Sequence, residues 1–222
     1  MTPVTGTGGW AGGVGHPGLR LAVGAAGLAA TAALARRRQV GAREDRMFRA
    51  ANDLPDCLYA PVWPVMQLGN LAAAPLAAGA ALLAGERELA GRLLAGGSAS
   101  WALSKVVKRA VGRARPAALL PRTRRRGREQ SGLGYLSGHA AVAVALGAAA
   151  LPHLGRRARL PVLVAMPVVG LCRLYVGAHL PLDVIGGASL GLAVEAAVAA
   201  VGGAQRPSAR PWASTTARSC AR

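Results

Sequence analysis

The chain has 222 residues, of which 52% are hydrophobic and 4% aromatic, and its formal net charge is +18. The apolar residues form long blocks rich in Ala, Leu, Val and Gly, and Lys and Arg cluster between the blocks, as they do in membrane proteins. This clustering argues against nucleic-acid binding, which the net charge alone would favour. The nine acidic residues do not cluster and the three Cys include no close pair, so no metal site, disulfide framework or cofactor is expected.

The first half of the chain predicts three helices separated by polar segments. Leu21–Ala35 is apolar but has only 15 residues, and we interpret it as a first helix. Residues 39–56 are polar and are expected to form a loop or an interfacial helix. Trp63–Ala84 has 22 residues without a charge and is long enough to cross a bilayer as one helix. A third helix is expected over Leu89–Val107.

The second half opens with a basic segment that extends to Arg128. Its stretch 122–128 holds five Arg residues and cannot be buried in hydrocarbon. Beyond it, apolar sequence predicts further helices at 137–151, 160–171 and 184–201. From Gln205 the chain is basic with Pro and Ser, and this tail is expected to be disordered.

These elements predict an all-α fold, a polytopic membrane bundle of five to six transmembrane helices with the active site at one membrane face. The chain is divided into an N-terminal segment with the first helix, a membrane core and a basic tail, which correspond to residues 1–56, 57–203 and 204–222.

The first of three polar patterns at the edges of apolar blocks is Lys108, six residues, then Arg115-Pro116. If the third helix continues through this stretch, Lys108 and Arg115 are nearly two turns apart and share a face. Two fixed cations suit a phosphate dianion, since Arg can bind two of its oxygens at once. Pro116 is then expected to help end that helix.

The second pattern is Ser137-Gly138-His139, directly before an apolar block. A helix that begins here presents unpaired backbone N–H groups to an anion. Gly138 allows close approach of the backbone, Ser137 adds a hydroxyl donor, and His139 can exchange a proton.

The third pattern is Arg173, five residues, His179, three residues, Asp183. His179 and Asp183 are one helical turn apart, so the carboxylate can hold one imidazole nitrogen and leave the other free to attack. Pro181 suits the first turn of the helix that would present the pair.

Each pattern alone has an ordinary explanation. A histidine at a helix end is usually interfacial, and cations beside an apolar block usually report topology. All three together supply a phosphate site, a nucleophile and a proton donor, which favours an enzyme. Glu195, inside the last apolar block, is expected to have a structural role, for example by pairing with a cation in the bundle.

In this order and spacing, the patterns resemble the signature of the type 2 phosphatidic acid phosphatase superfamily, also called lipid phosphate phosphatases. That signature is Lys-x6-Arg-Pro, Pro-Ser-Gly-His and Ser-Arg-x5-His-x3-Asp, and the resemblance spans roughly residues 60–202. The matching segments are Lys108-x6-Arg115-Pro116, Leu136-Ser137-Gly138-His139 and Cys172-Arg173-x5-His179-x3-Asp183. Leu136 stands where the family usually has Pro and Cys172 where it usually has Ser, and neither position carries an assigned chemical step.

The resemblance implies a metal-independent phosphatase that acts on phosphatidic acid, phosphatidylglycerol phosphate or a polyprenyl diphosphate. It implies that His179, oriented by Asp183, attacks phosphorus to give a phosphohistidine, and that His139 protonates the leaving group. The phosphate would be bound by the remaining motif residues, which are Lys108, Arg115, Ser137, Gly138 and Arg173.

Three other readings compete with this one. Vanadium-dependent haloperoxidases share the signature, but they are soluble and larger, so the transmembrane blocks argue against them. A lipid phosphotransferase stays open, because the sequence does not separate water from another acceptor. A non-catalytic basic membrane protein that binds anionic lipid would need no His–Asp pair, and the pair is present.

The expected location is the cell membrane, in a multi-pass arrangement whose partners are the bilayer and a lipid phosphate. With six helices, the loops at 36–62, 105–136 and 172–183 share one face with all three motifs and with most of the 27 Lys and Arg residues. The positive-inside rule would place this face in the cytoplasm, whereas the resemblance implies the outer face. Because three of these cations belong to the motifs, we predict an outward-facing site with both termini in the cytoplasm.

Overall fold

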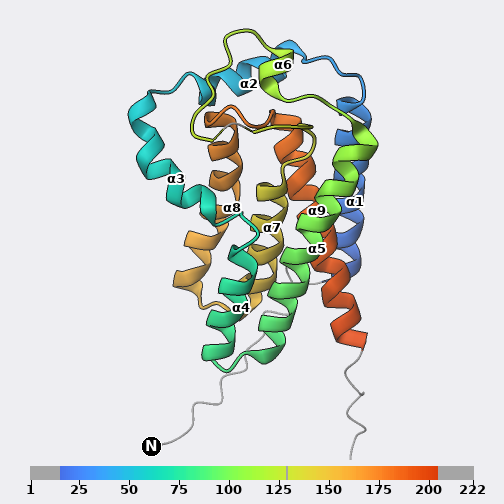
Figure 1. Cartoon of the computed structure of the whole chain (residues 1–222). Coiled ribbons are helices and arrows are strands. Elements are labelled where there is room, and N and C mark those ends of the chain that lie inside the picture. The colour runs from blue at the N-terminus through green and yellow to red at the C-terminus, as the bar shows by residue number, and fades with distance from the viewer. Residues whose placement is uncertain (1–15, 129, 205–222) are drawn as a thin grey trace, which may run out of the picture.

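The computed structural model describes residues 16–128 and 130–204, and every regular element in this part of the chain is helical (Figure 1). The all-α prediction is therefore confirmed, while the predicted disordered tail at 205–222 lies outside the described residues. The elements in chain order are α1 (Pro17–Ala35), α2 (Ala42–Asn52), η1 (Asp56–Leu58), α3 (Tyr59–Gln67), α4 (Ala73–Leu83), α5 (Arg87–Val111), α6 (Pro116–Leu119), α7 (Gly138–Ala150), η2 (Leu151–His153), α8 (Arg156–Tyr175) and α9 (Pro181–Ala204).

Long apolar helices run along the bundle. Within the described residues, three segments are long and apolar enough to cross a membrane: α1, α8 and residues Pro181–Gly202 of α9. Two shorter apolar helices, α4 and the stretch Gly138–His153, lie among them. The helix α5 has 25 residues and contains the expected third helix.

The predicted single helix at Trp63–Ala84 is wrong, because the chain breaks between α3 and α4. Asn70 stabilises the break, since its Oδ1 accepts a hydrogen bond from the backbone N–H of Ala73 at 2.9 Å and its Nδ2 donates to Gln67 at 3.0 Å. Pro75 contributes as well, because in a continuous helix its ring would clash with the carbonyl group four residues earlier. At the break, Gly69 packs so closely on the His139 carbonyl and on Val169 that a Cβ atom would not fit.

Small residues bring the central helices together. α9 packs against both α1 and α7. A Cβ atom at Gly187 would collide with the Ser137 carbonyl and one at Gly191 with the Ala141 carbonyl, so α7 and α9 approach at backbone distance. Such contacts are typical of helices that pack in lipid, where close van der Waals contact replaces the hydrophobic effect.

The helix α2 covers one end of the bundle, within the stretch predicted to be a loop or an interfacial helix. Phe48 is fully buried against Leu174 and Leu180. Asn52, also fully buried, donates to the carbonyls of Arg124, Leu174 and Tyr175 and so ties α2 to the end of α8. Together with α6 and the loops after α5 and α8, α2 forms one end of the bundle, at the top of Figure 1. We call it the catalytic end because the residues predicted to be catalytic lie in these loops and at the adjoining helix ends.

A cluster of three charged side chains lies deeper in the bundle. Glu195 of α9 accepts hydrogen bonds from Arg20 of α1 and Arg92 of α5, each at 2.5 Å. We name these three residues the deep cluster. The pairing of Glu195 with cations in the bundle is therefore observed, and it joins three helices at one point.

Candidate active site

All three sequence motifs meet at the catalytic end of the bundle. The motif residues come from the last turn of α5 and the loop after it, the first turn of α7, the last turn of α8, the loop between α8 and α9, and the first turn of α9. In that order, they are Lys108, Arg115, Ser137, Gly138, His139, Arg173, His179 and Asp183.

Lys108 and Arg115 do not share a helix face, contrary to the prediction. The helix α5 ends at Val111, and the next residue, Gly112, has a φ of 69°, the left-handed conformation in which glycine commonly ends helices. Arg115 then precedes α6, and Pro116 is the first residue of α6 rather than a terminator of α5. Pro is favoured at that position because a first-turn residue has no intrahelical use for its N–H.

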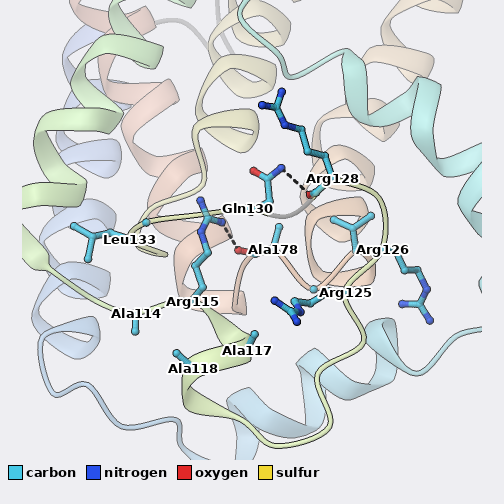
Figure 2. A pocket seen from close by; sticks show the side chains of 13 residues that line it. Ala114, Arg115, Ala117, Ala118, Arg125, Arg126, Arg128, Gln130, Leu133 and Ala178 are labelled. Atoms are coloured by element: carbon cyan, nitrogen blue, oxygen red, sulfur yellow. Dashed lines mark hydrogen bonds between the residues drawn. The ribbon is translucent and has the colours of Figure 1, made fainter.

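These two cations are held by loop carbonyls at the catalytic end. Lys108 Nζ donates to the carbonyls of Gly134 at 3.0 Å and Leu133 at 3.4 Å. The Arg115 guanidinium donates to the carbonyl of Ala178 at 2.8 Å, as Figure 2 shows, and to that of Ser131 at 3.1 Å. Ala178 directly precedes His179, so the loop geometry brings Arg115 beside the histidine.

The second motif forms the start of α7, as predicted. Ser137 is the N-cap, and its hydroxyl accepts a hydrogen bond from the Ala140 N–H at 3.4 Å. The backbone N–H of Ser137 donates to the Asp183 carbonyl at 2.8 Å, which ties the start of α7 to the start of α9. Gly138 and the half-buried His139 therefore lie in the same first turn, facing the end of α9 that carries Asp183.

The third motif places a buried cation beside the histidine. Arg173 is 3% exposed, and its guanidinium donates to the Met66 sulfur at 2.8 Å and to the Gln130 side chain at 3.5 Å. The Arg173 carbonyl accepts a hydrogen bond from the His179 N–H at 3.3 Å. Cys172, at the position usually held by Ser, is buried in an apolar cluster with Met66 and Tyr175.

His179 lies near Asp183, but the two residues are not on one helix, because only Asp183 belongs to α9. His179 precedes α9 by two residues, and Asp183 reaches back so that its Oδ2 accepts a hydrogen bond from the Leu180 N–H at 2.9 Å. This leaves Oδ2 3.6 Å from His179 Nδ1, which has no hydrogen-bond partner among the described residues. A contact of 3.6 Å is longer than a hydrogen bond, so His179 and Asp183 are close but not hydrogen-bonded to each other through their side chains.

The surroundings of His179 favour the neutral imidazole. Burial lowers the pKa of His179 well below its ordinary value, and the positive charges of Lys108, Arg173 and Arg115 lower it further. A neutral imidazole retains one nitrogen lone pair. Because Nδ1 faces Asp183, that lone pair is expected at Nε2, where it can act as a nucleophile.

The sequence analysis did not identify two residues of the catalytic end, Arg113 and Glu44. Arg113 is fully buried, and its two terminal nitrogens donate to the Glu44 carboxylate of α2 at 2.7 and 2.9 Å and to Asp183 Oδ1 at 3.3 Å. In the sequence, Arg113 is one of many cations in a basic segment, and Glu44 lies 69 residues earlier in a polar stretch. Neither residue carries a local signal that would separate it from its neighbours.

A small pocket opens on the loop side of Arg115. It has a volume of about 280 Å³, and its walls include Arg115, Arg125, Gln130 and Ala178 (Figure 2). Gln130 also contacts Arg173, so the pocket adjoins the motif residues without containing His179. Among residues 16–128 and 130–204, no group of three or more His, Cys, Asp or Glu residues could hold a metal ion.

Comparison with known proteins supports the resemblance seen in the motifs. One solved structure with a similar fold is a transmembrane PAP2-type phosphatidylglycerolphosphate phosphatase from Bacillus subtilis, with a TM-score of 0.64 and 20% identity over 83% of this chain and 98% of that one. Another is LpxE from Aquifex aeolicus, with a TM-score of 0.61 and 21% identity over 70% of this chain and 93% of that one. At these identities the likeness concerns the fold alone. No curated protein matches the sequence. The model of the PAP2 superfamily matches residues 89–207, more than half of the chain, and the protein therefore belongs to the PAP2 superfamily.

Proposed function

We propose that the protein hydrolyses the phosphate or diphosphate group of a membrane lipid, without a metal ion, through a phosphohistidine on His179. One observation carries this proposal. The buried imidazole of His179 lies beside the buried carboxylate of Asp183 and is surrounded by the cations Lys108, Arg115 and Arg173. Fixed cations stabilise the charge of a phosphoryl transition state, which is the task that divalent metals perform in many other phosphatases.

In the first proposed step, His179 Nε2 attacks phosphorus while the bond from phosphorus to the lipid oxygen breaks. His139 donates a proton to that oxygen, so a lipid alcohol leaves, or a lipid monophosphate if the substrate is a diphosphate. The Ser137 hydroxyl and the backbone of Gly138 help to bind the phosphate oxygens at the start of α7, where the helix dipole favours negative charge.

In the second step, water attacks the phosphohistidine, the bond between phosphorus and Nε2 breaks, and inorganic phosphate leaves. His139, neutral after the first step, accepts the proton of the attacking water. If an alcohol takes the place of water, the same intermediate makes the protein a phosphotransferase. That alternative shares every residue of the first step and differs only in the acceptor.

An apolar cavity supports a lipid as the substrate. It has a volume of about 690 Å³ and lies between α4, α5, α7 and α8, with Leu76, Leu93, Leu146 and Val169 among its lining residues. One end of it reaches the break between α3 and α4, where Gly69 touches the His139 carbonyl. A hydrocarbon chain in this cavity would place its polar end near the motif residues, and burial of each CH₂ group contributes about 0.8 kcal/mol.

The expected location is the cell membrane, with the bundle crossing it several times and the catalytic end outside. Single cysteines placed in the 122–128 loop, in a background free of other cysteines, test the orientation. If the catalytic end lies outside the cell, the thiol in this loop reacts with a membrane-impermeant reagent in intact cells. Protection in intact cells with reaction after lysis would place the catalytic end in the cytoplasm.

The central experiment measures phosphate release by the detergent-purified protein. The substrates are phosphatidic acid, phosphatidylglycerol phosphate, a polyprenyl diphosphate and glucose 6-phosphate, each with and without a soluble alcohol as a competing acceptor. We expect release from at least one lipid and a poorer turnover of the sugar phosphate. Better turnover of glucose 6-phosphate than of every lipid would refute the lipid assignment, and transfer to the alcohol in place of release would favour the phosphotransferase.

A further inference from the structure

Three buried charges at the catalytic end form a second layer behind His179. Arg113 lies between the carboxylates of Glu44 and Asp183, and we name these residues the catalytic cluster. Arg113 and Asp183 are fully buried, and Glu44 is 9% exposed. The cluster joins α2, the loop after α5 and α9. Burying three charges is costly, so it requires that each group be paired.

Hydrogen bonds hold both oxygens of Asp183. Oδ1 accepts from Arg113 at 3.3 Å, and Oδ2 accepts from the Leu180 N–H at 2.9 Å. A carboxylate held at both oxygens cannot rotate about its terminal bond without losing both hydrogen bonds. Oδ2 is therefore kept on the side of His179 Nδ1, 3.6 Å away.

Glu44 is the closer of the two carboxylate partners of Arg113. The guanidinium forms a bidentate pair with Glu44 at 2.7 and 2.9 Å, and its contact with Asp183 is longer. Glu44 also accepts a hydrogen bond from the Leu182 N–H at 3.2 Å, in the first turn of α9. Because Glu44 offsets much of the charge of Arg113, Asp183 retains negative charge with which to attract a proton on Nδ1.

We propose that Arg113 and Glu44 are positioning residues for His179, which act through Asp183 to keep the imidazole proton on Nδ1 and the lone pair on Nε2. Neither residue touches the reacting atoms. The proposal rests on the proposed role of His179 as the nucleophile. It assigns a function in the reaction to α2, a helix that carries none of the family motifs.

The test compares Arg113→Met, Arg113→Lys and Glu44→Gln with Arg92→Met as the matched control. Arg92 is also paired with a buried carboxylate, Glu195 in the deep cluster, although its own side chain is only partly buried. Two properties of the full-length purified proteins are measured: kcat and KM on the best lipid substrate, and the His179 tautomer at neutral pH from imidazole ¹⁵N chemical shifts. The His179→Ala spectrum assigns the resonances.

Arg113→Met is expected to lower kcat about 10- to 100-fold with KM within about 3-fold, the range typical of groups that orient a reacting side chain through its partner. The His179 signal should change from the Nδ1–H form to a mixture of both tautomers. Arg113→Lys should recover part of kcat, because it keeps the charge. Glu44→Gln, which preserves the shape of the side chain, should lower kcat by a smaller factor. Arg92→Met should leave kcat and the tautomer unchanged.

The two measurements separate this proposal from the proposed function. If the wild-type protein releases no phosphate from any lipid but Arg113→Met changes the tautomer, the lipid phosphatase assignment fails and the positioning role stands. If kcat and the Nδ1–H tautomer survive in Arg113→Met, the positioning role is wrong while the phosphatase assignment holds. Should Arg113→Met fail to fold, unchanged kcat and tautomer in both Arg113→Lys and Glu44→Gln would refute the role equally.

Discussion

The catalytic cluster and the deep cluster each join three charged side chains from different parts of the bundle, but with opposite composition. The catalytic cluster has one arginine between two carboxylates, and the deep cluster has one carboxylate between two arginines. The two clusters lie about 18 Å apart along α9, because Glu195 is 12 positions after Asp183 and a helix rises about 1.5 Å per residue. Only the first cluster has a histidine in reach of its carboxylate in the part of the chain that the structure describes.

This difference indicates two uses of buried charge in one bundle. In the deep cluster, each oxygen of Glu195 accepts a charge-assisted hydrogen bond of 2.5 Å from an arginine. In the catalytic cluster, Asp183 has a longer contact with its arginine and one oxygen turned toward His179. A carboxylate shared by two arginines holds helices together, whereas one that also faces a histidine can orient that histidine.

The largest expected effect is that of His179→Ala. This change removes the proposed nucleophile and should lower kcat by at least about 10⁴-fold, as loss of a catalytic nucleophile does in other covalent enzymes. The unfolding temperature should stay close to that of the wild type, because the His179 side chain makes no hydrogen bond to residues 16–128 or 130–204. His16→Ala is the control and should keep full activity, because His16 is exposed at the start of α1 and its side chain makes no capping hydrogen bond. Near-normal phosphate release by purified His179→Ala would exclude the mechanism.

The next largest effect separates the two carboxylates. Asp183→Asn should lower kcat about 10²- to 10⁴-fold, because an amide cannot stabilise the Nδ1 proton as a carboxylate does. Glu195→Gln, the same change in the deep cluster, should leave kcat within about 2-fold, since no reacting group is nearby. The measurement is kcat for both variants on one lipid substrate. Equal losses in the two variants would show that the clusters do not differ in function.

Stability should show the reverse order. Glu195→Ala leaves the partly buried Arg20 and Arg92 without their shared partner, and for a fully buried pair such a loss costs about 3–5 kcal/mol, which is the upper limit here. We expect a lower unfolding temperature in detergent, with kcat at low temperature unchanged. Replacement of all three residues by apolar ones, Arg20→Leu with Arg92→Met and Glu195→Leu, should restore much of the loss. A Glu195→Ala protein as stable as the wild type would contradict a structural role for the deep cluster.

The smallest effects concern ions in solution. A chelator should leave turnover unchanged, whereas vanadate, an analogue of pentavalent phosphorus, should inhibit it and raise the unfolding temperature. The stabilisation follows from binding to the folded state alone, and is about 2.7 kcal/mol at 100 times the dissociation constant. It should persist in Glu195→Gln and disappear in Arg173→Met, because only the cations of the catalytic end bind the anion. Loss of activity with chelator and recovery with magnesium would overturn the metal-free assignment.

Much of the fold and of the site's local geometry could be predicted, because it depends on neighbours in sequence. α7 begins at the Ser137-Gly138-His139 motif and Pro181 begins α9 as expected, since helix starts depend on backbone groups a few residues away. The all-helical fold and the meeting of the motifs at one end follow from the lengths of the apolar blocks and the polar gaps between them. Trp63–Ala84 shows where composition alone misleads, because Asn70 and Pro75 break an uncharged block that is long enough to span.

The sequence by itself determined the superfamily, the helical bundle and the order of the motif residues along the chain. Only the tertiary structure decided which cations are buried and which face the surface. Arg113 and Arg109 stand four positions apart in one basic segment, yet the first is fully buried and the second is exposed. The cost of burying a charge depends on the partners that surround it, and the carboxylate that pairs best with Arg113 comes from α2, 69 residues away. No local pattern records such a partner, because the pairing exists only after the helices have packed.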